Sequence, residues 1–140
     1  MMFQTYAVPY LATAIVFFGV DFIWLSTMTS RFYRSRMGEI LLDQPNSVAA
    51  GLFYLVYVAG VVYLAVLPAV SGGSVVTALV GGAVLGLVAY GTYDMTNLAT
   101  LKNWSLSLSL VDIAWGTFLT SLAATSGYFV TTWIAARSGG

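Results

Sequence analysis

Four long stretches of the sequence are almost free of charged residues, and this feature constrains the fold more than any other. A helix that crosses a bilayer needs about 20 mostly apolar residues, and each stretch is longer than that. Irregular backbone exposed to lipid is excluded inside the hydrocarbon, because its polar groups would lack hydrogen bonds. The sequence therefore predicts an all-α, integral membrane four-helix bundle. Its spans cover approximately residues 6–29, 47–70, 74–101 and 107–136.

The composition supports a membrane location and a single domain. Of the 140 residues, 59% are hydrophobic and only 7% are charged, whereas a soluble domain carries about 25% charged residues. One transmembrane domain over residues 1–140 is the usual arrangement for a chain of this length. The first apolar stretch is long, contains an acid and lacks a basic segment before it, so we do not expect a cleavable signal peptide.

Cysteine and histidine are both absent, which excludes several kinds of chemistry. Without cysteine there are no disulfides, thiolate nucleophiles or cysteine-based metal sites. Without histidine there is no histidine-ligated haem and no catalytic unit that pairs histidine with serine or cysteine. We therefore predict no cofactor and no metal site. The net charge is zero and the five lysines and arginines are scattered, so nucleic acid is not an expected partner.

The connection after the first span is longer than the other two and is amphipathic. Tyr33, Met37 and Ile40 share one face of a helix, away from Arg31. This pattern predicts a short interfacial amphipathic helix between the first and second spans, within residues 31–44, that lies on the membrane surface. A lid over a binding site is the alternative interpretation.

Basic residues near the ends of the spans indicate the orientation. On one side of the bundle lie Arg31, Arg34, Arg36 and Lys102, whereas the other side has only Arg137. Because cytoplasmic loops carry an excess of lysine and arginine, the first and third loops are predicted to be cytoplasmic. Both termini then lie outside the cytoplasm. On the cytoplasmic side, Trp104 is expected to anchor the protein at the membrane interface.

Three of the five acidic residues, Asp21, Asp94 and Asp112, lie inside the predicted spans. Each would cost about 2.5–3.5 kcal/mol at mid-bilayer, so we expect all three to face the interior of the bundle. At a rise of 1.5 Å per residue they lie roughly 12–15 Å from the cytoplasmic basic residues, and therefore at one level. Neither lysine nor arginine lies at that level. Either most of the acids are protonated, or a cationic group enters from outside.

Aromatic and amide side chains accompany these acids. A tryptophan follows the first and third acids by three residues, and a tyrosine and an asparagine share one helical face with the second. Two tyrosines of the second span reach the same level. The sequence thus predicts a polar chamber formed by all four helices. Its candidate catalytic residues are Asp21, Asp94 and Asp112, and its candidate ligand-binding residues are Trp24, Tyr54, Tyr57, Tyr90, Asn97 and Trp115.

The third span also contains the motif Gly82-x-x-x-Gly86, which allows helices to approach closely. Packing within the bundle is our first interpretation. A homodimer through the Gly82 and Gly86 face is the alternative.

The sequence contains the blocks DFIWL, FYRSRMG, PNSVAAGLFYLVYVAGVVYLAVLPA, GLVAYGTYDMTNLATLKNW and LVDIAWGTFLT. In these blocks it resembles the bacterial family of predicted membrane proteins numbered 2177 among the domains of unknown function. The resemblance extends from the first span to the fourth, and YDxTNxAT and VDxAWG are its most specific parts. It implies a multi-pass protein of the bacterial inner (cytoplasmic) membrane, and it implies no particular reaction.

Three functions remain open. The first is an enzyme or binding protein for a lipid or small hydrophobic molecule, in which the carboxyl groups perform acid–base chemistry. The second is a small proton-coupled or cation transporter, with the acids as proton relay or cation site. The third is an accessory subunit of a membrane complex, whose polar interior only joins the helices. We place the first ahead of the other two. The expected partners are the lipid bilayer and a lipid or small hydrophobic ligand.

Overall fold

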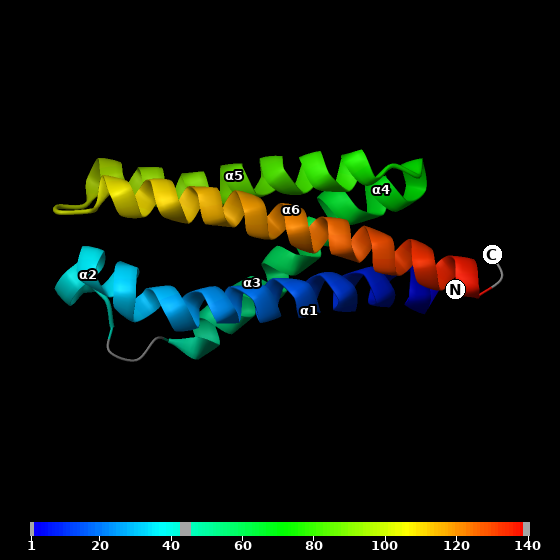
Figure 1. The fold of residues 1–140 in the computed structure, drawn as a ribbon, viewed down its shortest axis with the longest axis horizontal. Helices are drawn as coiled ribbons and strands as arrows, with labels where there is room; N and C mark the ends of the chain where they lie inside the picture. The colour runs from blue at the N-terminus through cyan, green and yellow to red at the C-terminus, as the bar shows by residue number, and fades with distance from the viewer. Residues whose placement is uncertain (1, 43–45, 139–140) are drawn as a thin grey trace.

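The computed structural model describes residues 2–42 and 46–138, and all regular structure in this part of the chain is helical (Figure 1). Four helical segments are long and apolar enough to cross a membrane: Gln4–Ile40, Ser47–Gly72, Val75–Thr100 and Leu106–Arg137. The all-α fold with four candidate spans is therefore confirmed. The elements are α1 (Met2–Met28), the π-helical turn η1 (Thr29–Tyr33), α2 (Arg34–Met37), the 3₁₀ turn η2 (Gly38–Ile40), α3 (Ser47–Val61), the π-helical turn η3 (Val62–Val66), α4 (Leu67–Gly72), α5 (Val75–Thr100) and α6 (Leu106–Arg137).

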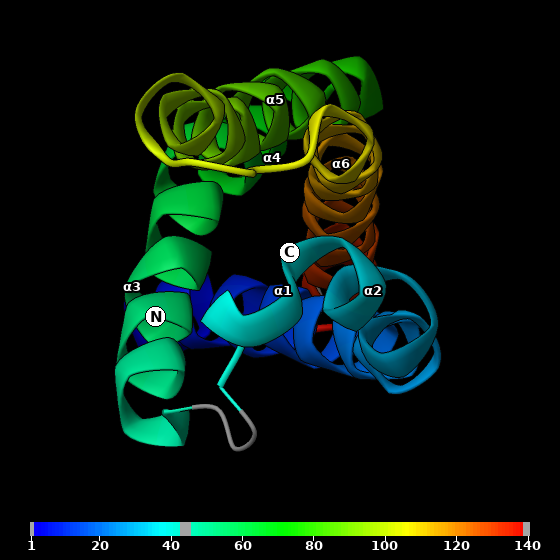
Figure 2. The same cartoon turned by 90° about the vertical axis from the view of Figure 1, so that its left-hand side faces the viewer.

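The four segments surround a common interior. Seen along the bundle, they follow one another in the order α3, α5, α6 and α1 (Figure 2). Helix α6 packs against both α5 and α1 along much of its length, whereas α3 contacts α1 and crosses the bundle obliquely. Its continuation, η3 and α4, contacts α5 and α6. Helix α6 is therefore the central element, since it packs against α5 on one side and against α1 on the other.

The second span changes its helical geometry where proline interrupts it. Pro68 stands in the first turn of α4 and has no N–H to donate, and its ring crowds the carbonyl four residues earlier. The residues before it, Val62–Val66, form the π-helical turn η3. A local π-helical adjustment of this kind keeps a proline-containing helix continuous inside a membrane.

Gly82 and Gly86 pack α5 onto α6 within the chain. A Cβ atom on Gly82 would lie 2.8 Å from Cα of Ser121, and one on Gly86 would overlap the Gly116 carbonyl and lie 2.9 Å from Cα of Thr117. Both glycines are buried. The first interpretation of the motif is thus confirmed. The homodimer alternative stays a prediction.

The helical segment extends beyond the predicted end of the first span, although α1 itself ends at Met28. The helix does not stop near residue 29 but continues through η1 and α2 as far as Ile40. Thr29–Met37 contains no glycine or proline, and the α-helix ends where Gly38 adopts φ 60° and ψ −130°, a conformation open to glycine. A separate interfacial helix is not confirmed, and residues 43–44 of that prediction lie outside the described residues.

Trp104 is buried at the turn between α5 and α6. Only 8% of its surface is exposed, and its indole Nε1 donates a hydrogen bond to Oγ of Ser109 at 2.9 Å. Its ring also meets the ring of Tyr93 edge to face, with centroids 5.9 Å apart. Trp104 therefore stabilises this turn, and its place at the membrane interface stays a prediction.

Candidate functional site

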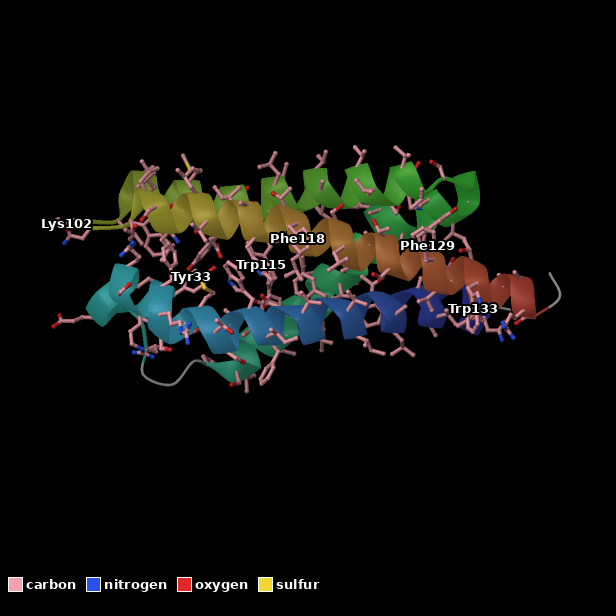
Figure 3. The ribbon with its side chains drawn as sticks, viewed as in Figure 1. Tyr33, Lys102, Trp115, Phe118, Phe129 and Trp133 are labelled. Carbon is pink, nitrogen blue, oxygen red and sulfur yellow. The ribbon has the colours of Figure 1, made fainter. Side chains whose placement is uncertain are left out.

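Polar and aromatic side chains from four elements meet near the end of the bundle that carries η1 and the α5–α6 turn. We define the acidic cluster as Asp21 and Trp24 of α1, Tyr33 of η1, Asp94 of α5, and Asp112 and Trp115 of α6. Figure 3 shows Tyr33 and Trp115 between the ribbons of α1 and α6, with Lys102 at the adjacent tip of the molecule. Asp112 interacts electrostatically with both Asp21 and Asp94. Asp112 therefore lies near both of the other acids that the sequence places inside the bundle.

Two acids of the cluster are held by aromatic hydrogen-bond donors. Nε1 of Trp115 donates to Oδ1 of Asp21 at 3.0 Å. The Tyr33 hydroxyl donates to Oδ1 of Asp112 at 2.7 Å and accepts from Nε1 of Trp24 at 3.1 Å. The indole rings of Trp24 and Trp115 stack on each other, with centroids 4.1 Å apart and planes within 8°. This stack joins the two hydrogen-bonded sets into one network between α1, η1 and α6.

Asp94 differs from the other two acids. Its side chain is completely buried, at 0% exposure, and its carboxyl group receives no hydrogen bond from an N–H or a hydroxyl group among the described residues. The Ser109 hydroxyl approaches the backbone carbonyl of Asp94 at 3.5 Å, not the carboxyl group. The carboxyl group lies instead within hydrogen-bonding distance of the Asp112 carboxyl. Two buried carboxyl groups in contact hold one proton between them more readily than two negative charges.

The predicted tyrosines form an aromatic group beside the cluster. Tyr90 lies against Gly116, where a Cβ atom would overlap its ring, and it meets Tyr57 edge to face at 6.3 Å. Tyr54 packs on Phe17 at 5.7 Å between ring centroids. Tyr54 and Tyr90 both interact electrostatically with acids of the cluster. The Tyr57 hydroxyl instead pairs with that of Thr120 at 2.9 Å, so Tyr57 supports the aromatic group from outside the cluster.

Asn97 pairs with a tyrosine of its own helix. It is half-buried, and its side chain hydrogen-bonds that of Tyr93, which is exposed over 53% of its surface. The ligand-binding role of Asn97 stays a prediction.

Tyr33 is the functional candidate that reasoning from the sequence missed. The pattern assigns it to the apolar face of a connector, whereas the structure places its hydroxyl between Trp24 and Asp112. In a regular α-helix a separation of nine residues would put Tyr33 and Trp24 on opposite sides, and the π-helical turn η1 changes that phase. The one available signal was its position in the FYRSRMG block.

The described residues contain no group of three potential metal ligands placed to hold an ion. Two surface depressions occur elsewhere. One is lined by Phe129, Val130, Thr132 and Trp133, and the other by Arg34, Gly38, Glu39, Leu41 and Leu42. Neither contains a residue of the acidic cluster, so a ligand of the cluster would have to reach it from another direction.

Four apolar segments around a buried group of acids define a multi-pass, all-helical membrane protein. The chain matches the family model described as "Predicted membrane protein (DUF2177)" over residues 6–129. It belongs to this family, which is the one that its sequence blocks resemble. The matched region includes the whole acidic cluster. No curated protein and no solved structure matches the chain.

Proposed function

We propose that this membrane protein binds a lipid or another small hydrophobic molecule at the acidic cluster and acts on it with its carboxyl groups as acid and base. The observation that supports this is the completely buried Asp94 carboxyl, which lies against the Asp112 carboxyl and receives no hydrogen bond from any other group in the described part of the chain. Two carboxyl groups in contact hold one proton between them more readily than two negative charges. Such a pair can pass a proton to a ligand or take one from it.

The neighbours of Asp94 suit this role. Asp112 keeps one oxygen, Oδ1, in a hydrogen bond with Tyr33, and it lies close enough to Asp94 to act with it on one polar group. Trp24 and Trp115 form a rigid apolar wall, because their stack and their indole hydrogen bonds fix both rings. Carboxyl groups in such surroundings can donate or accept a proton near neutral pH.

Mass spectrometry of the molecules that co-purify with the protein in mild detergent tests this proposal. We expect a defined hydrophobic molecule with the wild type and its loss in Asp94→Asn. Glu39→Gln is the matched control, because it makes the same chemical change at an exposed acid outside the cluster. Identical contents in all three preparations, with the variants folded, would count against a ligand at the cluster.

A second candidate function is exchange of protons for a cation. It is favoured by the proximity of Asp94 and Asp112, which come from different helices. Two neighbouring carboxyl groups hold one negative charge more readily than two, so a proton and a cation could compete for the pair. Protein in liposomes that contain a pH-sensitive dye would then release protons when a cation gradient is applied. The release should disappear in Asp94→Asn and persist in Glu39→Gln.

The orientation belongs to the same proposal. We place the acidic cluster in the cytoplasmic half of the membrane, with both termini outside the cytoplasm, because Arg31, Arg36 and Lys102 all lie at the Tyr33 end. The chain has no cysteine, so single cysteines report on sidedness directly. A membrane-impermeant maleimide applied to intact cells should label Ser138→Cys and leave Ser35→Cys unlabelled. The reverse pattern would invert the orientation.

A further inference from the structure

Four of the five basic residues lie at one end of the bundle and are exposed there. We define the basic surface as Arg31 of η1, Arg34 and Arg36 of α2, and Lys102 of the α5–α6 turn. Helix α2 and this turn lie at the same tip of the molecule, and Lys102 projects from it (Figure 1, Figure 3). Along the sequence, the stretches 29–46 and 101–105 carry these four basic residues and only two acids, Glu39 and Asp43. Their net charge is therefore positive.

The basic surface lies at the depth of the lipid headgroups. The helical segment Gln4–Ile40 has 37 residues and is about 55 Å long at a rise of 1.5 Å per residue. A bilayer is about 40–45 Å thick with its headgroups, so the last turns of this segment reach the headgroup region when its first turns start at the opposite surface. Leu42 and Leu101 are exposed close to the basic residues in the chain. Cationic and apolar groups therefore share this end of the molecule.

Arg36 is held in a fixed position on the basic surface. Its Nε donates a hydrogen bond to Oγ of Ser107 at 3.1 Å, and its guanidinium lies 4.9 Å from the centroid of the Phe32 ring. The side chain is nevertheless exposed. A guanidinium group has five N–H donors in a planar fork that matches the oxygens of a phosphate group, and among the described residues only the Nε donor is used. Arg36 is therefore preorganised to bind a phosphate with its other donors.

Lys102 supplies a second positive charge from a different segment. It forms no ion pair or hydrogen bond with another residue that the structure describes. Ser107, which holds Arg36, stands in the first turn of α6, directly after the turn that carries Lys102. The two cationic side chains therefore belong to one part of the surface. Each lysine or arginine near a membrane surface adds to the attraction of anionic lipids.

We propose that the basic surface binds the phosphate group of an anionic phospholipid, with Arg36 and Lys102 as its principal contacts. The occupant is a lipid and not a free phosphate ion, because the surface lies at headgroup depth beside exposed leucines that an acyl chain can cover. The bound phosphate joins α2 to the α5–α6 turn. The basic surface contains no residue of the acidic cluster, so this inference is independent of the proposed function.

The test measures which of two lipids stays bound to the protein. Purified full-length protein in a neutral maltoside detergent receives phosphatidylglycerol and phosphatidylcholine in equal amounts and with the same acyl chains, and native mass spectrometry gives the ratio of the bound lipids. The variants are Arg36→Gln, Arg36→Lys, Lys102→Gln and the double variant with glutamine at both positions. The helical signal and the melting temperature establish that each variant is folded.

Arg137→Gln is the matched control for Arg36→Gln. Arg137 is also exposed, and its guanidinium also lies over an aromatic ring, 4.6 Å from the centroid of Trp133. It lies at the other end of the bundle from Lys102, as the position of Trp133 shows (Figure 3). The two variants thus make the same chemical change in similar surroundings at opposite ends.

We expect the wild type and Arg137→Gln to prefer phosphatidylglycerol, and Arg36→Gln and Lys102→Gln each to reduce this preference about fivefold. The double variant should reduce it further, and Arg36→Lys, which keeps the charge, should retain most of it. Equal binding of the two lipids to the wild type would overturn the inference. An unaltered preference in the double variant, or an equal loss in Arg137→Gln, would overturn it as well.

Two further arms test the nature of the contact. Sodium chloride should weaken the preference of the wild type, because salt screens exposed charges, and a preference that does not respond to salt would contradict an electrostatic contact. Inorganic phosphate, titrated without lipid and followed by calorimetry, separates the two sources of a phosphate group. The absence of binding that depends on Arg36 would support the lipid, whereas phosphate binding that Arg36→Gln abolishes would overturn the lipid as the occupant.

Discussion

The two halves of the bundle hold their helices together in different ways. In the half around Gly82 and Gly127, small residues let the backbones approach, and Gly127 lies directly against Oγ1 of Thr13. In the half around the acidic cluster, large side chains such as Trp115 and Tyr33 separate the helices and join them through hydrogen bonds. Both solutions are known for membrane helices, which gain little from hydrophobic burial against one another. Only the second places carboxyl groups in the interior, whereas the buried polar side chains of the first, such as Thr13 and Thr120, are uncharged.

The largest effect should come from filling the small-residue half. Gly86→Leu would push a side chain into the backbone of Gly116 and Thr117. Backbone atoms inside a helix cannot move aside as a flexible side chain can. We expect the free energy of unfolding to fall by about 3 kcal/mol. Unfolding by sodium dodecyl sulfate in mixed micelles, followed by circular dichroism, measures it.

Gly91→Leu, on the same helix, is the control for this prediction. A Cβ atom on Gly91 meets no neighbouring segment within 4 Å. Its stability should stay within about 1 kcal/mol of the wild type. Equal losses for both variants would mean that helix propensity, not the contact of α5 with α6, sets the stability of this half.

The second prediction compares the contributions of two neighbouring acids, Asp94 and Asp112, to stability. Asp94→Leu removes a buried carboxyl group whose only polar neighbour in the described structure is the Asp112 carboxyl, so we expect a gain in stability of about 1–2 kcal/mol together with loss of ligand binding. Asp112→Leu also removes the acceptor of the Tyr33 hydroxyl and should lower stability by a similar amount. The same unfolding assay compares them. Destabilisation by Asp94→Leu would show that the contact between the two carboxyl groups stabilises the fold.

The sequence predicted the spans and the convergence of the acids from simple physical rules. The length of the apolar stretches gave the four helices, and the high cost of an acid facing lipid placed Asp21, Asp94 and Asp112 inside. Both results depend only on composition along one helix. They therefore do not need the tertiary structure.

Other features depend on the contacts between helices, which patterns along a single segment of the sequence do not predict. The π-helical turn η1 decides where Tyr33 points, and no local pattern announces such a turn. The glycine motif is compatible with packing inside one chain or between two, and only the position of α6 decides. Likewise, the spacing of the acids does not show that Asp112 and Asp21 accept hydrogen bonds from Tyr33 and Trp115, because each donor lies on a different segment from its acceptor.

A smaller effect tests whether hydrogen bonds matter in the polar half. Tyr33→Phe keeps the ring in its buried group but removes the hydroxyl that bonds Asp112 and Trp24. We expect a loss of about 1 kcal/mol in stability and a change in the near-ultraviolet circular dichroism of the tryptophan stack. Tyr10→Phe is the matched control, since its hydroxyl also joins two helices, through the Leu55 carbonyl at 2.9 Å. It should leave the tryptophan signal unaltered, and an equal change in both variants would contradict a specific role for Tyr33.

The smallest expected effect concerns two buried threonine hydroxyl groups, only one of which has a hydrogen-bond partner among the described residues. Thr13 is completely buried in the small-residue half, and its hydroxyl has no partner among the described residues. Thr13→Val keeps the shape and should be neutral or slightly stabilising. Thr120 is equally buried but its hydroxyl pairs with that of Tyr57, so Thr120→Val should lose about 0.6 kcal/mol. The unfolding assay resolves this difference when both variants are measured together. A loss in Thr13→Val as large as in Thr120→Val would mean that the Thr13 hydroxyl also has a hydrogen-bond partner.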